Sequence, residues 1–164
     1  MSDSRTEISS LRDASGYRLS EERQAQLLER EIECVFGWTN LDGHPIGITQ
    51  AFVYRDGVFW MCTERSRARA RAIERDPRSC VTVFTARKSR TMSFKGTSEI
   101  LDDRETVLWF LREIARRYDP EDPQAQEAHI AAADHPGRAV IKFTPETITN
   151  AFDGGLARRR TGTS

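Results

Sequence analysis

Two Asp-Gly turns separate short β-rich segments near the middle of the sequence, and they limit the folds open to the chain. Residues 34–40, 46–54 and 58–63 are rich in β-branched and aromatic side chains, with the turns "LDGHP" and "RDG" between them. An Asp-Gly pair between such segments is a typical hairpin signal. Connections this short cannot join parallel strands, so the sequence predicts an antiparallel meander. No GxGxxG pattern follows a strand, which disfavours a doubly wound dinucleotide-binding sheet.

Helices and further strands are predicted around this meander. Ser20 is a suitable N-cap for an amphipathic helix over 21–33, and the alanine- and arginine-rich segment 66–77 predicts a second helix that ends at Pro77. The other predicted elements are strands at 79–86, 91–101 and 139–152 and helices at 104–118 and 124–134. The predicted fold class is mainly β (α+β), a small antiparallel barrel of five to seven strands with peripheral helices.

Length and composition predict one domain with loose ends. A chain of 164 residues is long enough to enclose its own core. Residues 1–19 are polar and predict a flexible N-terminal arm, 20–153 the folded domain, and 154–164 a flexible tail. The three cysteines are widely spaced, which disfavours disulfides and a zinc site. Without an apolar segment of membrane-spanning length, we expect a cytoplasmic protein with no membrane partner.

The stretch "CTERSRARARAIERDPR" gives a neutral chain a local positive charge. The chain has 25 Lys and Arg and 25 Asp and Glu, but residues 55–90 contain ten basic and four acidic residues. A basic patch on a neutral protein favours a small anionic ligand over nucleic acid. An arginine-rich helix can also be no more than a solvated surface, and the spacing of the arginines leaves this alternative open.

The start of the arginine-rich helix is a candidate phosphate site. If the helix begins near Ser66, then Arg65 and Arg67 lie beside its N-terminus, where free N–H groups and the helix dipole favour an anion. Thr63 adds a hydroxyl at the end of the preceding strand. Guanidinium groups are well suited to phosphate because they present paired donors.

The ordered set of motifs resembles the pyridoxamine 5'-phosphate oxidase-like split-barrel superfamily of flavin and deazaflavin oxidoreductases. The resemblance runs from "LDGHPIGITQAFVYRDGVFWMCTERSRARARAIERDPRSCVTVF" to "MSFKGTSEILDD", with a weaker similarity in "AVIKFTPETITNAFDG". It covers about residues 25–103. It implies a split β-barrel, a homodimer, and a bound FMN or coenzyme F-420 whose site is completed by the partner chain.

The resemblance also implies a set of cofactor-binding residues. Second-strand residues would face the cofactor ring, and residues around the third strand and its helix would bind the phosphate. The ring-facing candidates are Thr49, Gln50, Ala51 and Phe52, and the phosphate-binding candidates are Thr63, Arg65, Ser66, Arg67 and Arg69. Glu64 stands where the family often has a small residue, which places a negative charge beside the phosphate.

The resemblance implies an oxidoreductase that transfers a hydride to or from a small organic substrate. A non-catalytic flavin- or haem-binding protein of the same fold is the alternative, and a structural dimer with solvated arginines is a third possibility. The sequence identifies no general acid or base. Phe52, Trp38 and Trp60 are predicted to lie in the barrel core.

Overall fold

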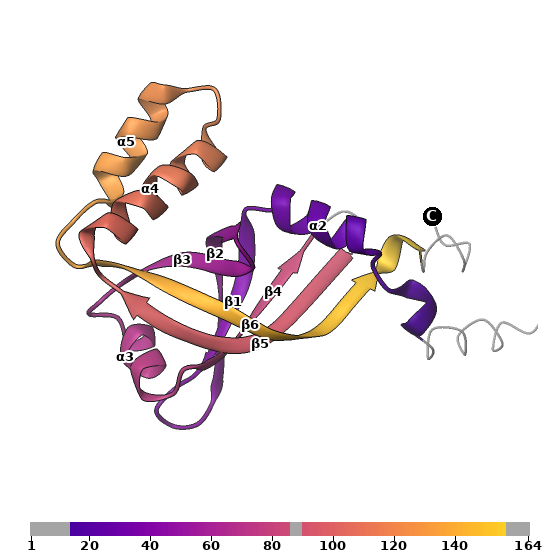
Figure 1. Ribbon diagram of the computed structural model, residues 1–164. Coiled ribbons are helices and arrows are strands. Elements are labelled where there is room, and N and C mark those ends of the chain that lie inside the picture. Colours follow the sequence, from indigo (N-terminus) through magenta and orange to yellow (C-terminus); the bar gives the residue numbers. More distant parts are fainter. Residues whose placement is uncertain (1–13, 86–89, 157–164) are drawn as a thin grey trace, which may run out of the picture.

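A computed structural model describes residues 14–85 and 90–156 as a closed antiparallel barrel (Figure 1). Its strands are β1 (Glu33–Thr39), β2 (Pro45–Arg55), β3 (Val58–Glu64), β4 (Arg78–Phe84), β5 (Arg90–Leu101) and β6 (Arg138–Asp153). Around the barrel their order is β1-β2-β3-β6-β5-β4. The predicted small antiparallel split barrel with peripheral helices is confirmed, and the predicted 139–152 segment forms one long strand.

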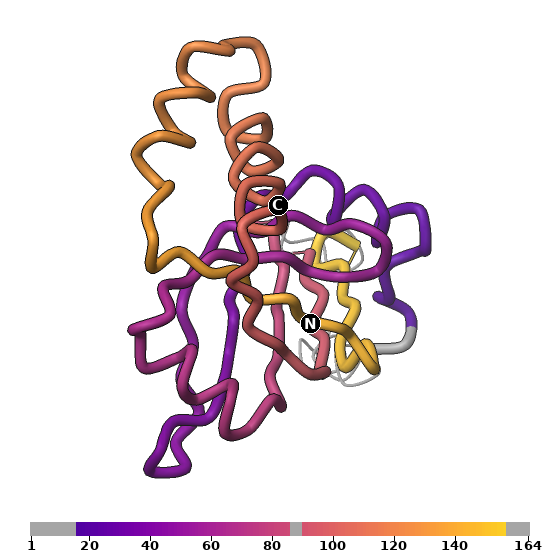
Figure 2. The backbone as a smooth tube through the Cα atoms, turned by 60° about the vertical axis from the view of Figure 1, so that its left-hand side comes forward, coloured from indigo at the N-terminus to yellow at the C-terminus, as the bar shows by residue number. Residues whose placement is uncertain are grey.

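Helices occupy the ends and one outer side of the barrel. They are the 3-10 helix η1 (Ala14–Tyr17), α2 (Glu21–Arg30), α3 (Ala68–Arg75), α4 (Arg104–Tyr118) and α5 (Pro123–Ala133). Ser20 and Asp103 cap α2 and α4 by accepting a backbone N–H from the first turn. In Figure 2 the α4–α5 hairpin projects from one side of the barrel, away from its far end. No helix among the described residues is both long and apolar enough to cross a membrane.

Alternation along the strands produces two apolar clusters, one on each face of the sheet. Phe36, Phe52, Phe59 and Phe143 have no exposed surface and fill the barrel interior. The second cluster joins the outer face of β2 and β6 to the apolar side of α4; its buried members are Val53, Val107, Phe110, Leu111, Ile114 and Val140. The prediction that Phe52 is a core residue is therefore confirmed. Trp60 differs, because it lies with the outer cluster and is only partly buried.

The folded domain extends further than the sequence predicts at its N-terminal side. Tyr17 and Leu19 are 3% and 2% exposed, so these two side chains pack on the barrel. Two apolar side chains are too short a pattern to reveal such packing from sequence. The rest of the predicted arm, 1–13, and residues 157–164 of the predicted tail lie outside the described residues.

The seams between strands differ in length. β5 and β6 pair over twelve positions, from Arg90↔Asp153 to Leu101↔Val140. β2 and β3 pair over four, from Arg55↔Val58 to Phe52↔Met61. The barrel is therefore least tightly joined where β2 approaches the end of β3.

Candidate functional site

The candidate site lies where the β2–β3 ladder ends. Beyond the Phe52↔Met61 pair, the carbonyl oxygen of Cys62 accepts from side chains, not from the next rung of the ladder. Gln50 Nε2 donates to it over 2.7 Å and an Arg69 NH2 group over 3.2 Å. One backbone oxygen thus connects the second strand, the third strand and the helix that follows it.

Arg69 is held a second time by Thr63. The guanidinium Nε donates to Thr63 Oγ1 over 2.8 Å, and Thr63 has no exposed surface. The structure therefore places Thr63 behind Arg69, as a group that orients the guanidinium.

The environment of Arg69 suits an anion. Burial is the largest influence and lowers the pKa of Arg69 below its ordinary value, with nearby Arg67 and Arg138 acting in the same direction. Partial loss of water strengthens the attraction between the guanidinium and an approaching negative group. Its second terminal nitrogen has no hydrogen bond recorded to the described residues.

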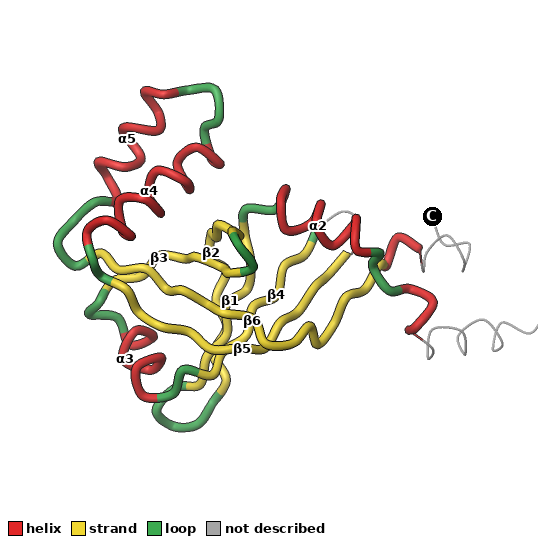
Figure 3. Tube along the Cα trace, viewed as in Figure 1, coloured by secondary structure: helices red, strands yellow, loops and turns green. Residues whose placement is uncertain are grey.

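Helix α3 begins two residues later than the sequence predicts. Its first residue is Ala68 and its N-cap is Arg67, which supplies no side-chain cap. A tight turn precedes it, in which the Arg67 N–H donates to the Glu64 carbonyl over 3.0 Å. Ser66 is exposed within this turn. Figure 3 shows α3 joined to the end of β3 by this short loop. Because no side chain caps the start of α3, its first backbone N–H groups can bind a ligand.

The other predicted arginines point to different partners. Arg65 pairs with Glu74 at 2.9 Å and with Asp102 at 3.5 Å, which ties it to the side of α3. Arg67 pairs with Glu64 at 3.5 Å. Arg69 is therefore the member of the arginine run that is partly buried and anchored by two hydrogen bonds.

Glu64 is balanced by its neighbours. Its Oε1 lies 3.5 Å from Arg67 and 3.7 Å from His135 Nε2, and its β6 partner in the sheet is Arg138. His135 comes from the α5–β6 connection and Arg138 is the first residue of β6, both more than 70 positions away in sequence. Their approach to the site depends on the pairing of β3 with β6, which no local motif signals.

The predicted ring-facing residues divide between the two faces of β2. Gln50 and Phe52 face inward, whereas Thr49 is exposed and Ala51 packs with the outer cluster. With no exposed surface, the Phe52 side chain is closed to a ligand. Gln50 is 8% exposed, and its Oε1 has no hydrogen-bond partner in the part of the chain that the structure describes. An unpaired buried acceptor is costly and is a common mark of a group that meets a partner in another state.

The structure therefore brings Gln50, Thr63 and Arg69 together around the Cys62 carbonyl, with Ser66 and Arg67 at the adjoining helix start. It turns Arg65 and the Phe52 ring away. Among the described residues, no group of three or more His, Cys, Asp or Glu side chains is arranged to hold a metal ion.

Comparison with models of known protein families shows which family this chain belongs to. The profile of the pyridoxamine 5'-phosphate oxidase family matches residues 19–152, which include the whole barrel except its last residue. The chain belongs to this family. The resemblance in the sequence is thereby confirmed. No curated relative matches the chain.

Solved structures with the same fold include three whose descriptions differ in function. A conserved hypothetical protein from Mycobacterium tuberculosis superposes with a TM-score of 0.72 at 19% identity, covering 84% of this chain and 86% of that one. An F420 reductase gives 0.59 at 22% identity, with 76% and 94% covered. A haem storage protein from Vibrio cholerae gives 0.61 at 11% identity, with 82% and 97% covered. Identities this low establish a shared fold and no more.

Proposed function

We propose that this protein is a flavin-type oxidoreductase that uses coenzyme F-420 or FMN and transfers a hydride to or from a small organic substrate. The observation that carries the proposal is Arg69, a partly desolvated guanidinium fixed by Thr63 and Cys62 beside the uncapped start of α3. Both cofactors contain a phosphate group. Family membership and the F420 reductase among the structural neighbours give further support.

The residues at the end of β3 fit a phosphate on two counts. Arg69 retains N–H donors after bonding to Thr63 and Cys62, and the first turn of α3 has N–H groups with no side-chain cap. In the proposal Arg69, Arg67, Ser66 and these N–H groups bind the phosphate. Thr63 acts through Arg69.

The second strand would orient the ring of the cofactor. When bound, the cofactor supplies the hydride chemistry, and the protein positions it and excludes water. Thr49 and Ala51 present the outer face of β2, and the residues of β2 that precede Phe52 are not paired with β3. Gln50 Oε1 can accept an N–H group if the strands separate slightly.

The proposal includes a homodimer in which the partner chain covers the cofactor, as the family resemblance implies. Light scattering on the purified protein, with and without cofactor, tests this part directly. A monomer at micromolar concentration in the presence of saturating cofactor would remove it.

Titration with FMN and with coenzyme F-420, followed by absorbance and fluorescence, tests the cofactor. Tight binding of one of them to the wild type is expected, with a loss of about a hundredfold or more in the Arg67→Ala, Arg69→Ala double variant. Arg112→Ala is the matched control, because it removes an exposed arginine from α4 and should change affinity less than about twofold. Equal affinities for the double variant and the control would contradict the phosphate site.

Turnover separates the oxidoreductase from the non-catalytic carrier. After a cofactor has been identified, its reduced form is mixed with candidate substrates and reoxidation is followed by absorbance. An oxidoreductase reoxidises with saturation in substrate concentration. A carrier binds the cofactor with the same arginine dependence and gives no such saturation.

A further inference from the structure

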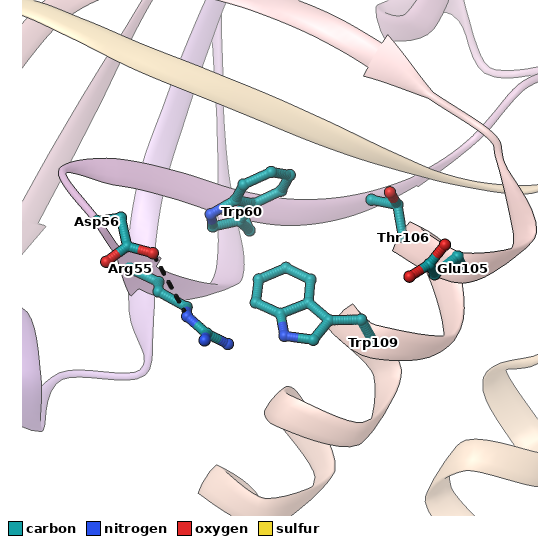
Figure 4. A pocket seen from close by; sticks show the side chains of 6 residues that line it. All are labelled: Arg55, Asp56, Trp60, Glu105, Thr106 and Trp109. Carbon is teal, nitrogen blue, oxygen red and sulfur yellow. Dashed lines mark ion pairs between the residues drawn. The ribbon is translucent and has the colours of Figure 1, made fainter.

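A pocket opens on the outer face of the barrel, at the opposite end of β3 from Arg69. It has a volume of about 390 Å³ and is lined by Arg55, Asp56, Trp60, Glu105, Thr106 and Trp109. Figure 4 shows the two indoles at its centre, with Arg55 and Asp56 on one side and Glu105 and Thr106 on the other. Its size lies within the range of small-molecule sites, about 300–1,000 Å³.

The aromatic walls are held in place by the fold. The Trp60 and Trp109 ring centroids lie 5.0 Å apart at 75°, an edge-to-face arrangement. Trp60 comes from β3 and Trp109 from α4, and both pack on the outer apolar cluster. The indoles are thus preorganised by two elements that are already fixed to each other.

A hydrogen-bond donor lies buried in the wall of the pocket. The Trp60 indole N–H has no partner among the described residues, and because it is closed to solvent, a ligand reaches it only if a neighbouring side chain moves. In Figure 4 this nitrogen lies on the side of the ring nearest Arg55 and Asp56. Arg55 covers the Trp109 ring, with its guanidinium carbon 5.5 Å from the centroid. Because Arg55 is 55% exposed and its ion pair to Asp56 spans 3.5 Å, little holds it there.

The charges around the indoles disfavour an ionic ligand of either sign. Asp56 and Glu105 repel an anion, and Arg55, which already covers the Trp109 ring, competes with a cation for that ring. An uncharged ligand that offers both a hydrogen-bond acceptor and a donor is not repelled by these charges. Its acceptor can bond to the Trp60 N–H and Arg55, and its donor to the Asp56 carboxylate.

We propose that this pocket binds an uncharged planar aromatic carboxamide. The ring replaces the Arg55 guanidinium over Trp109, the amide oxygen accepts from the Trp60 N–H and from the displaced Arg55, and the amide nitrogen donates to Asp56. This inference does not depend on the proposed oxidoreductase function, because the pocket shares no residue with the site at Arg69.

Benzamide is a suitable probe, and the three tryptophan indole N–H signals in a ¹⁵N-correlated NMR spectrum are the readout. Each signal is assigned by a Trp→Phe variant. Titration is expected to move the Trp60 signal downfield in a saturable way, with a Kd on the order of 1 mM for a ligand of about nine non-hydrogen atoms. The Trp38 signal should remain unchanged, since Trp38 lies on β1. A Trp60 signal that does not saturate, or that moves no more than that of Trp38, overturns the proposal.

Two further ligands, titrated into the wild-type protein, test whether the pocket requires a planar ring and an uncharged group. Cyclohexanecarboxamide has the same amide on a non-planar ring and should bind at least about fivefold more weakly, because it cannot stack. Benzoate should also bind more weakly, because Asp56 and Glu105 repel it. Equal binding of cyclohexanecarboxamide and benzamide overturns the stacking, and equal binding of benzoate overturns the charge argument.

Two variants complete the test. Trp109→Leu should weaken benzamide about fivefold, with circular dichroism checking that the fold is kept. Asp56 has φ 52°, a left-handed conformation that asparagine tolerates, so Asp56→Asn is not expected to disturb the turn. It should increase benzoate affinity severalfold, because a negative charge is removed, and weaken benzamide about threefold, because the amide nitrogen then donates to a neutral oxygen and not to a carboxylate. Unchanged benzoate affinity in this folded variant would contradict the assigned role of Asp56.

Discussion

Two seams of the barrel differ most in length, and the difference shows why the candidate site lies where it does. We call the longest, β5–β6, the closed seam and the shortest, β2–β3, the open seam. Along β5–β6, twelve paired positions satisfy the backbone, and two register shifts accommodate the bend of the sheet. Along β2–β3, pairing stops after four positions. The Cys62 carbonyl is then available to Gln50 and Arg69. Stability comes from the long seam, whereas the short seam provides backbone groups that position functional side chains.

Gly96 is expected to be the most sensitive position of the closed seam. A Cβ there would lie 2.1 Å from the Thr144 carbonyl oxygen, which belongs to the facing backbone and cannot move away. Gly96→Ala should therefore lower the free energy of unfolding by about 3 kcal/mol, measured by urea denaturation. Gly47→Ala is the control, because its Cβ meets only a Val35 methyl at 3.4 Å. If the two variants lose equal stability, the close approach of β5 and β6 is not what constrains Gly96.

Asp153 secures the end of the same seam. Burial by itself raises the pKa of Asp153, but the Leu156 and Gly155 N–H groups and the Arg90 and Arg23 guanidinium groups outweigh it and hold the pKa below the ordinary 3.8. A carboxyl whose pKa is lower in the folded state stabilises the fold above its unfolded pKa and loses this effect as the pH falls.

Asp153→Asn should therefore lower the free energy of unfolding by about 2 kcal/mol at pH 7. The difference from wild type should shrink as the pH drops below about 4, because Asp153 becomes protonated first in the unfolded chain and then, at still lower pH, in the folded chain. Thermal unfolding at pH 7 and at pH 3 measures both values. A difference that stays constant over this interval would mean that the charge of Asp153 does not contribute.

Arg69→Lys tests the open seam. Lysine keeps the positive charge but lacks the planar fork that bonds to Thr63 and Cys62 while leaving donors for a ligand. Cofactor affinity should fall about tenfold, less than the loss expected for removal of the charge. Isothermal titration calorimetry gives the value. No loss at all would show that charge alone matters at this position.

Arg65→Ala should have the smallest effect of the series. Arg65 pairs with Glu74 and Asp102 on an exposed surface, and such pairs contribute little. Its removal is expected to change cofactor affinity by less than about twofold. A loss comparable to that of Arg69→Lys, in the same titration, would mean that Arg65 turns toward the ligand on binding.

Much of the fold is predictable from sequence because its signals are local. The Asp-Gly turns, the Ser20 and Asp103 caps and Pro77 each mark a boundary through their own backbone preferences, and the observed elements begin and end within a few residues of them. Tyr17 and Leu19 were not predictable in this way. Their burial depends on packing against the end of the barrel.

Only part of the site can be predicted from sequence, because the choice among its residues depends on packing between distant segments. The run from Thr63 to Arg69 marks the right segment, but spacing does not show which guanidinium is partly buried and anchored. That choice depends on where the β2–β3 ladder ends and on the Cys62 carbonyl, which is a backbone group. Trp60 was predicted in the core because strand alternation does not reveal which face is inward when both faces are covered.

The central claim is that Thr63 holds Arg69 at the open seam so that Arg69 can bind the cofactor phosphate. A double-mutant cycle of Thr63→Val and Arg69→Ala, with cofactor affinity measured for all four proteins, tests it most directly. Thr63→Val should weaken binding about fivefold when Arg69 is present. It should cause no further loss when Arg69 is alanine. The same loss in both backgrounds would contradict the claim, because Thr63 would then act without Arg69.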